Sequence, residues 1–238
     1  MNPMARLRLR MVFLALVVGA VLPLACGQPP APASSKSGAP AAGGSGGGSS
    51  TFQIVFLGDS LTSGYGLLSD QAFPALVQAK FAAEGYSNVE TVNAGVTGDT
   101  SAGGLRRVEQ ALTPETRILV VALGGNDALR GLTVSQTHDN LGGIIDVAVS
   151  RNVAVLLAGI QPPTNYGEDY RTTFNDIFMH LLSEYRGRLN LMPFLLEGVA
   201  GVPSLMQADG MHPNADGARV VADTIYPRLR TMVDAIGH

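Results

Sequence analysis

From about residue 52 onward, short apolar runs alternate with longer segments in which apolar residues recur every three or four positions. The runs predict five buried strands, at residues 54–57, 89–92, 118–123, 153–158 and 189–194. The longer segments predict amphipathic helices at about residues 72–84, 101–112, 134–150, 170–186 and 215–236. Strands that alternate with helices through right-handed crossovers form a parallel sheet covered on both faces. The pattern therefore predicts one three-layer α/β/α domain over residues 52–238.

The first 25 residues follow a different pattern, in which Arg6, Arg8 and Arg10 precede an uncharged apolar run at 11–25. A basic segment followed by a short apolar one is typical of an export signal. The run is also short for a membrane-spanning helix, because a residue adds only about 1.5 Å and the hydrocarbon core is about 30 Å thick. The sequence "LPLAC" resembles the lipobox of bacterial lipoproteins, and Pro23 departs from its usual form. We expect cleavage before Cys26, lipidation of Cys26 and a location in the cell envelope facing the periplasm, with the outer membrane favoured, or simple secretion.

The segment between the export signal and the domain has no apolar period. Residues 26–51 are rich in Pro, Gly and Ser and predict a disordered linker. Cys26 is the chain's single cysteine, so the domain has no disulfide and depends on packing for its stability.

Charge argues against a nucleic-acid partner. The first 50 residues hold four of the 16 Lys and Arg residues and none of the 19 Asp and Glu residues, which leaves a net charge of −7 for the remainder. A surface of that sign repels a phosphate backbone, so we expect no nucleic-acid binding.

Polar residues follow the predicted strands, at the edge where open parallel sheets carry their sites. "GDS" follows the first strand, "NAG" the second and "GGND" the third, and "ADGMHPNADG" precedes the last helix. An acyl-transfer site needs a nucleophile, a base, a group that orients the base, and donors for the oxyanion. These roles would be filled by Ser60, by His212, by Asp209, and by the Gly95 N–H together with the Asn126 side chain.

Structural roles are the alternative for several of these residues. Gly95 would then serve only the backbone, Asn126 a turn and Asp209 a helix cap. We expect Asp59 to bond neighbouring backbone and Asp99 to cap the helix that follows it. Asp209 and His212 alone are too few ligands for a zinc site, so no metal is expected.

Four blocks in this order, G-D-S-L, a strand-end Gly, G-x-N-D and D-x-x-H-P, resemble the SGNH (GDSL) hydrolase family across nearly all of residues 52–236. The blocks are most similar to those of the bacterial multifunctional acyl-CoA thioesterase I, lysophospholipase and arylesterase group. The resemblance implies a flavodoxin-like sheet of order 2-1-3-4-5 and no cofactor. It also implies a triad of Ser60, Asp209 and His212, with the Ser60 N–H, the Gly95 N–H and the Asn126 side chain as oxyanion hole.

The expected substrate is a small acyl ester, a thioester or a lipid. Leu61, Leu129 and Tyr166 are predicted to contact it, and apolar walls of this kind suit an acyl chain better than a sugar. We expect a monomer, held at a membrane only through its lipid anchor. A carbohydrate O-deacetylase of the envelope and a non-catalytic binding lipoprotein are the alternatives.

Overall fold

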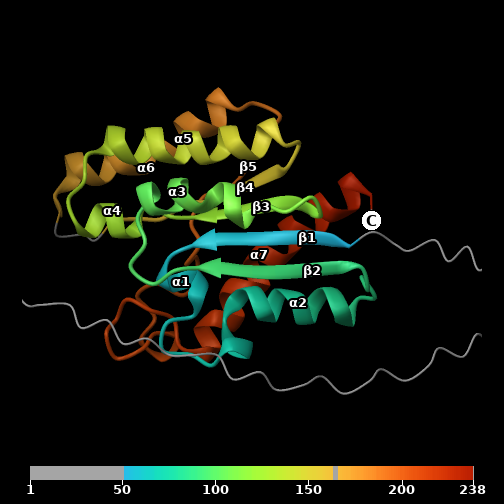
Figure 1. The fold of residues 1–238 in the computed structure, drawn as a ribbon. Coiled ribbons are helices and arrows are strands. Elements are labelled where there is room, and N and C mark those ends of the chain that lie inside the picture. The colour runs from blue at the N-terminus through green and yellow to red at the C-terminus, as the bar shows by residue number, and fades with distance from the viewer. Residues whose placement is uncertain (1–50, 163–165, 238) are drawn as a thin grey trace, which may run out of the picture. The chain divides into compact units, whose positions relative to one another are not determined.

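The sheet has the predicted order. The computed structural model describes residues 51–162 and 166–237, so the predicted export signal, Cys26 and nearly all of the linker lie outside the described residues. Its parallel strands are ordered β2-β1-β3-β4-β5 (Figure 1). They are β1 (Phe52–Gly58), β2 (Val89–Gly95), β3 (Thr116–Ala122), β4 (Ala154–Ala158) and β5 (Leu189–Met192). The predicted fold class is confirmed.

Helices cover both faces of the sheet, as Figure 1 shows. One face carries α2 (Phe73–Ala83) and α7 (Ala215–Ile236), and the other carries α3 (Ser101–Ala111), α5 (Val134–Ser150) and α6 (Glu168–Glu184). The three central strands, β1, β3 and β4, are almost wholly buried, which explains why they read as continuous apolar runs, whereas the edge strands β2 and β5 are partly exposed. No helix within residues 51–162 and 166–237 has the length and apolar character needed to span a bilayer.

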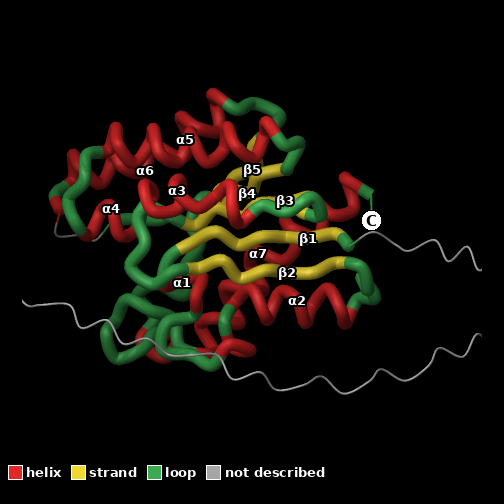
Figure 2. The backbone as a smooth tube through the Cα atoms, viewed as in Figure 1, coloured by secondary structure: helices red, strands yellow, loops and turns green. Residues whose placement is uncertain are grey.

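Among the elements that the structure describes in full, four short helical turns were not expected from the sequence. They are α1 (Ser60–Ser63), η1 (Ser69–Gln71), α4 (Gly125–Leu129) and η3 (Pro203–Leu205). Elements of three to five residues are too short to show a helical apolar period. Figure 2 shows that loops and short helices gather at the end of the sheet where α1 lies.

The expected cap of α3 is wrong by one residue. Thr100 is the N-cap, and its Oγ1 accepts the Gly103 N–H at 3.3 Å. The Asp99 carboxylate is instead paired with Arg107. A charged partner in three dimensions thus displaces the local capping role that an Asp has in an isolated helix.

Strand register brings the carboxyl ends of three strands to one level. Gly58 pairs with Gly95 on one side and with Ala122 on the other. The segments that follow β1, β2 and β3 therefore begin side by side, and they contain α1, the loop at 96–100 and α4.

Candidate active site

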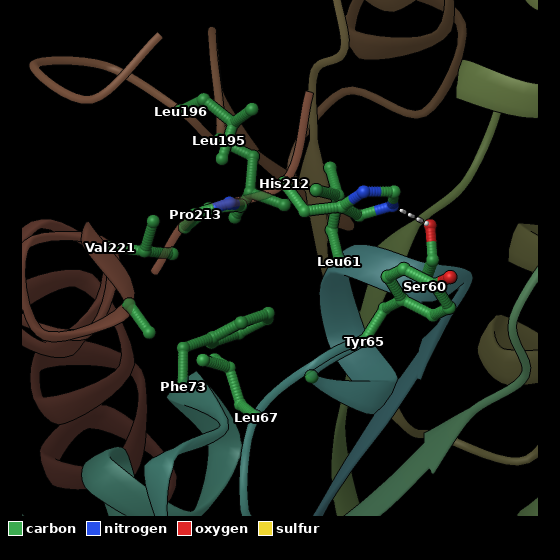
Figure 3. A pocket seen from close by; sticks show the side chains of 12 residues that line it. Ser60, Leu61, Tyr65, Leu67, Phe73, Leu195, Leu196, His212, Pro213 and Val221 are labelled. Atoms are coloured by element: carbon green, nitrogen blue, oxygen red, sulfur yellow. Dashed lines mark hydrogen bonds between the residues drawn. The ribbon is translucent and has the colours of Figure 1, made fainter. Parts of the chain in front are cut away.

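Ser60 begins α1 directly after β1 and faces His212, which lies in the loop before α7. Ser60 Oγ is 2.9 Å from His212 Nε2, the contact drawn in Figure 3. The two residues are 152 positions apart in the chain. The fold thus brings together the predicted nucleophile and base.

Asp209 holds the other side of the imidazole. Its Oδ2 lies 2.7 Å from His212 Nδ1, and its Oδ1 accepts the backbone N–H groups of Met211 at 2.9 Å and of His212 at 3.0 Å. The backbone hydrogen bond from His212, followed by the bonds from its ring and from Met211, lowers the pKa of Asp209 to about 2. A charged Asp209 accepts the Nδ1–H, which leaves Nε2 free to accept the Ser60 proton.

Asn126 lies in α4 and is oriented by the buried carboxyl of Asp59. Asn126 Nδ2 donates to Asp59 Oδ2 at 3.2 Å, which uses one of its two N–H groups and leaves the other for a ligand. Asp59 Oδ1 accepts the Leu61 N–H at 3.0 Å, so the predicted backbone contact of Asp59 is confirmed. Asp59 thus caps α1 and holds the predicted oxyanion donor at the same time.

Gly95 is close to the site, and its N–H already has an acceptor. It donates to Asn93 Oδ1 at 3.0 Å. A Cβ at Gly95 would lie 2.3 Å from the Ser63 nitrogen, so the residue also lets α1 pack against the end of β2. Packing alone therefore requires a glycine at this position, whether or not its N–H binds an oxyanion.

In the part of the chain that the structure describes, Gly98 has a free backbone N–H that the sequence analysis did not single out. It lies in the turn closed by the Asp99 N–H and the Val96 carbonyl at 3.0 Å, and its φ is +79°. Within the described residues its N–H donates to no group, while its carbonyl accepts Arg130 Nη2 at 2.7 Å. The signal in the sequence was a second glycine in "GVTGD", where the turn needs a positive φ.

An apolar pocket adjoins Ser60 and His212. It is lined by apolar groups from the segment after β1, from the loop after β5 and from α7, among them Leu61, Tyr65, Leu67, Phe73, Leu195 and Val221 (Figure 3). The pocket is small and has room for about one water molecule.

The three predicted substrate contacts do not all line this pocket. Leu61 does, whereas Leu129 and Tyr166 are not among its lining residues. The Tyr166 hydroxyl donates to the Leu129 carbonyl at 2.7 Å, so these two form a separate contact at the C-terminal end of α4. No group of three or more His, Cys, Asp or Glu side chains within residues 51–162 and 166–237 is arranged to hold a metal ion.

Comparison with known proteins matches this arrangement to one family. The model of the GDSL-like lipase/acylhydrolase family matches residues 56–220. The chain belongs to this family. It is 40% identical to esterase TesA of Pseudomonas aeruginosa, with 76% of this chain and 89% of TesA aligned. It is 38% identical to thioesterase 1/protease 1/lysophospholipase L1 of Escherichia coli K12, over 76% of this chain and 85% of that protein.

A solved GDSL-family structure agrees with the fold. The crystal structure of TesA superposes with a TM-score of 0.72 at 38% identity, covering 76% of this chain and 99% of that chain. The family resemblance drawn from the sequence blocks is therefore confirmed.

Asp59 makes the stability of the domain depend on pH. Burial raises the pKa of its carboxyl from the ordinary 3.8 to about 6, against the lowering effect of the bonds from Leu61 and Asn126. Between about pH 4 and pH 6 the folded state therefore binds more protons than the unfolded state, and the free energy of unfolding contributed by Asp59 falls as pH rises.

Asp59→Asn should remove this dependence. As pH rises through that window, the wild type should lose up to about 3 kcal/mol relative to the variant, at about 1.4 kcal/mol per pKa unit. Urea unfolding of both proteins between about pH 4 and pH 7 measures the difference. Parallel profiles for the two proteins would contradict the raised pKa.

Proposed function

We propose that this GDSL-family ester hydrolase cleaves carboxylic esters or thioesters with short acyl groups, through an acyl-enzyme on Ser60. The observation that carries the proposal is the hydrogen-bonded chain from Ser60 through His212 to Asp209, with steps of 2.9 and 2.7 Å. A hydroxyl, an imidazole and a carboxylate in this order are the parts of a serine hydrolase triad. Family membership and the two named enzyme relatives also oppose the non-catalytic binding alternative.

The geometry leads to a two-step reaction. His212 Nε2 takes the Ser60 proton as Oγ bonds to the acyl carbon, and the tetrahedral oxyanion collapses with loss of the alcohol or thiol, which receives that proton from His212. A water molecule, deprotonated by the same nitrogen, then attacks the acyl-enzyme. The bond to Ser60 Oγ breaks, and His212 returns the proton to Oγ. Asp209 stays charged throughout and stabilises the imidazolium.

The oxyanion hole comprises the Ser60 N–H, the free N–H of the Asn126 amide and a backbone N–H of the loop after β2. For the third donor we infer Gly98. Its N–H has no acceptor within the described residues, and the neighbouring Thr97 hydroxyl lies 3.0 Å from the Ser63 hydroxyl in α1. The role of the Gly95 N–H as an oxyanion donor stays a prediction, because that N–H would first have to break its hydrogen bond to Asn93.

Pocket size supports a short acyl group. Space for about one water is enough for a methyl group, and a longer chain would have to displace packed apolar side chains such as Leu67. An acetyl ester of a carbohydrate is favoured by the same observation and is the second candidate. The exposed ring of Tyr65, with its centroid 4.8 Å from that of the His212 ring, would face the alcohol of either substrate.

The sequence also supports an envelope location for the enzyme. We propose that residues 1–25 are removed as an export signal and that Cys26 then carries a lipid, which would tether a monomeric domain through the linker. Both features lie outside the described residues.

Ser60→Ala should abolish turnover of p-nitrophenyl acetate, because no nucleophile remains to form the acyl-enzyme. The measurement is steady-state release of p-nitrophenol together with the pre-steady-state burst, and circular dichroism controls for folding. A burst that persists in the folded variant would refute the assignment of Ser60.

Asn126→Ala should lower kcat by about 10²–10³-fold and leave KM nearly unchanged, because an oxyanion donor acts on the transition state. Because Asp59 also loses a partner, the variant's thermal unfolding is recorded alongside the kinetics. Near-wild-type kcat in a folded variant would contradict the role.

Leu67→Ala should widen the pocket and raise the decanoate-to-acetate ratio of kcat/KM by about tenfold, since each buried methylene contributes about 0.8 kcal/mol and about two more of them would be buried. The wild type should prefer acetate. Leu68→Ala is the matched control, because Leu68 is exposed and is not among the pocket-lining residues. A ratio unchanged by Leu67→Ala, or changed equally by both variants, would show that the acyl group lies elsewhere.

A further inference from the structure

Arg107, on α3, makes three hydrogen bonds toward the ends of β1 and β2. Its Nε donates to Asp99 Oδ2 at 2.7 Å, its Nη1 to the Ala94 carbonyl at 2.6 Å and its Nη2 to the Gly58 carbonyl at 2.9 Å. The side chains of Arg107 and Asp99 are only 22% and 13% exposed. One guanidinium therefore joins three backbone segments in a place largely shielded from water.

These three segments carry the candidate oxyanion donors and the nucleophile. Gly58 is two residues before Ser60, and the Ala94 carbonyl belongs to the same planar peptide group as the Gly95 N–H. Asp99 follows Gly98 and closes its turn. Arg107 thus fixes both ends of the segment 95–98 and ties that segment to the strand that leads into Ser60.

The segment needs such a restraint because it contains two glycines. Gly95 and Gly98 have no side chains to pack, and glycine has the widest backbone freedom. The Val96 N–H donates to the Gly58 carbonyl at 3.0 Å. This carbonyl therefore accepts hydrogen bonds from both Val96 and Arg107. The donors of an oxyanion hole must be held within about 0.5 Å of their working positions.

A second path leads from the same peptide to α1. The Gly95 N–H donates to Asn93 Oδ1, and Asn93 Nδ2 donates to the Thr62 carbonyl at 2.9 Å. The Asp99 carboxylate, which holds the guanidinium from the other side, fits only because position 103 is glycine. A Cβ there would lie 1.5 Å from Asp99 Oδ1.

We propose that Arg107 is a positioning residue for catalysis, which sets the oxyanion-binding backbone of residues 95–98 relative to Ser60. The inference rests on the proposed role of Ser60. Arg107 acts through the backbone and does not touch the substrate. Its planar fork donates to two carbonyls and a carboxylate at once, which a lysine ammonium on a flexible stem cannot reproduce.

The neighbouring Arg106 provides a matched control. It lies on the same helix and is exposed, and none of the hydrogen bonds or ion pairs described here involves it. Arg107→Lys and Arg107→Ala are compared with Arg106→Lys and Arg106→Ala in the full-length protein. Turnover of p-nitrophenyl acetate is normalised to the number of active sites titrated with a phosphonate ester.

Both Arg107 variants should lose about 10²-fold in kcat per titrated site, with KM within about twofold of wild type, because small misplacement of a donor acts on the transition state. Methylguanidinium should restore part of the kcat of Arg107→Ala by refilling the vacated position. The Arg106 variants should retain wild-type kcat and show no response to methylguanidinium.

Three results would overturn the proposal. One is an Arg107→Lys protein whose kcat per site is within about threefold of wild type. The second is a loss of activity that equals the loss of titratable sites, which would reflect folding alone. The third is an Arg107→Ala protein with no response to methylguanidinium. Full turnover in Ser60→Ala would instead refute the proposed function, so the two failures are distinguishable.

Discussion

The end of β1 is the constraint on which the site depends. A Cβ at Gly58 would lie 2.0 Å from Thr62 Oγ1 and 3.0 Å from the Ala122 carbonyl, so no side chain fits there. The chain can therefore turn at once from β1 into α1, and Ser60 projects from the edge of the sheet. Because the ends of β2 and β3 are level with Gly58, their loops must adapt to α1.

Buried carboxylates connect these loops to one another. Asp59 joins α1 to α4 through Asn126. The next residue, Asp127, is fully buried and accepts the Ser101 N–H at 2.8 Å as well as the Ser101 hydroxyl, which joins α4 to the start of α3. Each carboxylate is satisfied by several donors, and a buried network of this kind stays ordered only when its members are paired. The Asp residues of G-D-S and G-x-N-D therefore tie the segments that carry Ser60 and Asn126 to the elements next to them.

The sequence is informative where a signal repeats along an element. The strands at 118–123 and 153–158 and the helices at 134–150 and 215–236 were predicted within a residue or two, because their buried faces generate apolar runs or periods. Ser60, Asn126, Asp209 and His212 were predicted from their positions beside strands or the last helix, and the fold brings Ser60, Asp209 and His212 into contact. The direction of a single N–H cannot be found in this way. The Gly95 N–H is bonded to Asn93 Oδ1, whereas the Gly98 N–H, in the turn at Val96–Asp99, has no acceptor within the described residues.

Polar contacts between residues far apart in the sequence could not be predicted either. An Asp before Thr-Ser looks like a helix cap, and two adjacent arginines on a helix look like an exposed face. Only the packing of α3 against β1 distinguishes partly buried Arg107 from exposed Arg106. Nothing local in "GLRR" carries that difference, because it depends on carbonyls at positions 58 and 94.

The segments that carry Ser60 and His212, the proposed nucleophile and base, are also held together by the Gln207 side chain. Gln207 Nε2 donates to the Tyr65 carbonyl and to the Pro213 carbonyl, at 2.6 and 2.9 Å. Tyr65 follows α1, and Pro213 follows His212, so this amide spans the same gap as the bond between Ser60 and His212. Together with the Asn214 side chain, which caps α7 and donates to the Ser204 carbonyl at 2.9 Å, it fixes the His212 loop from both ends. A histidine on a loop can hold the position that the proposed base needs, because its loop is tied to the segment that carries Ser60 as well as to α7.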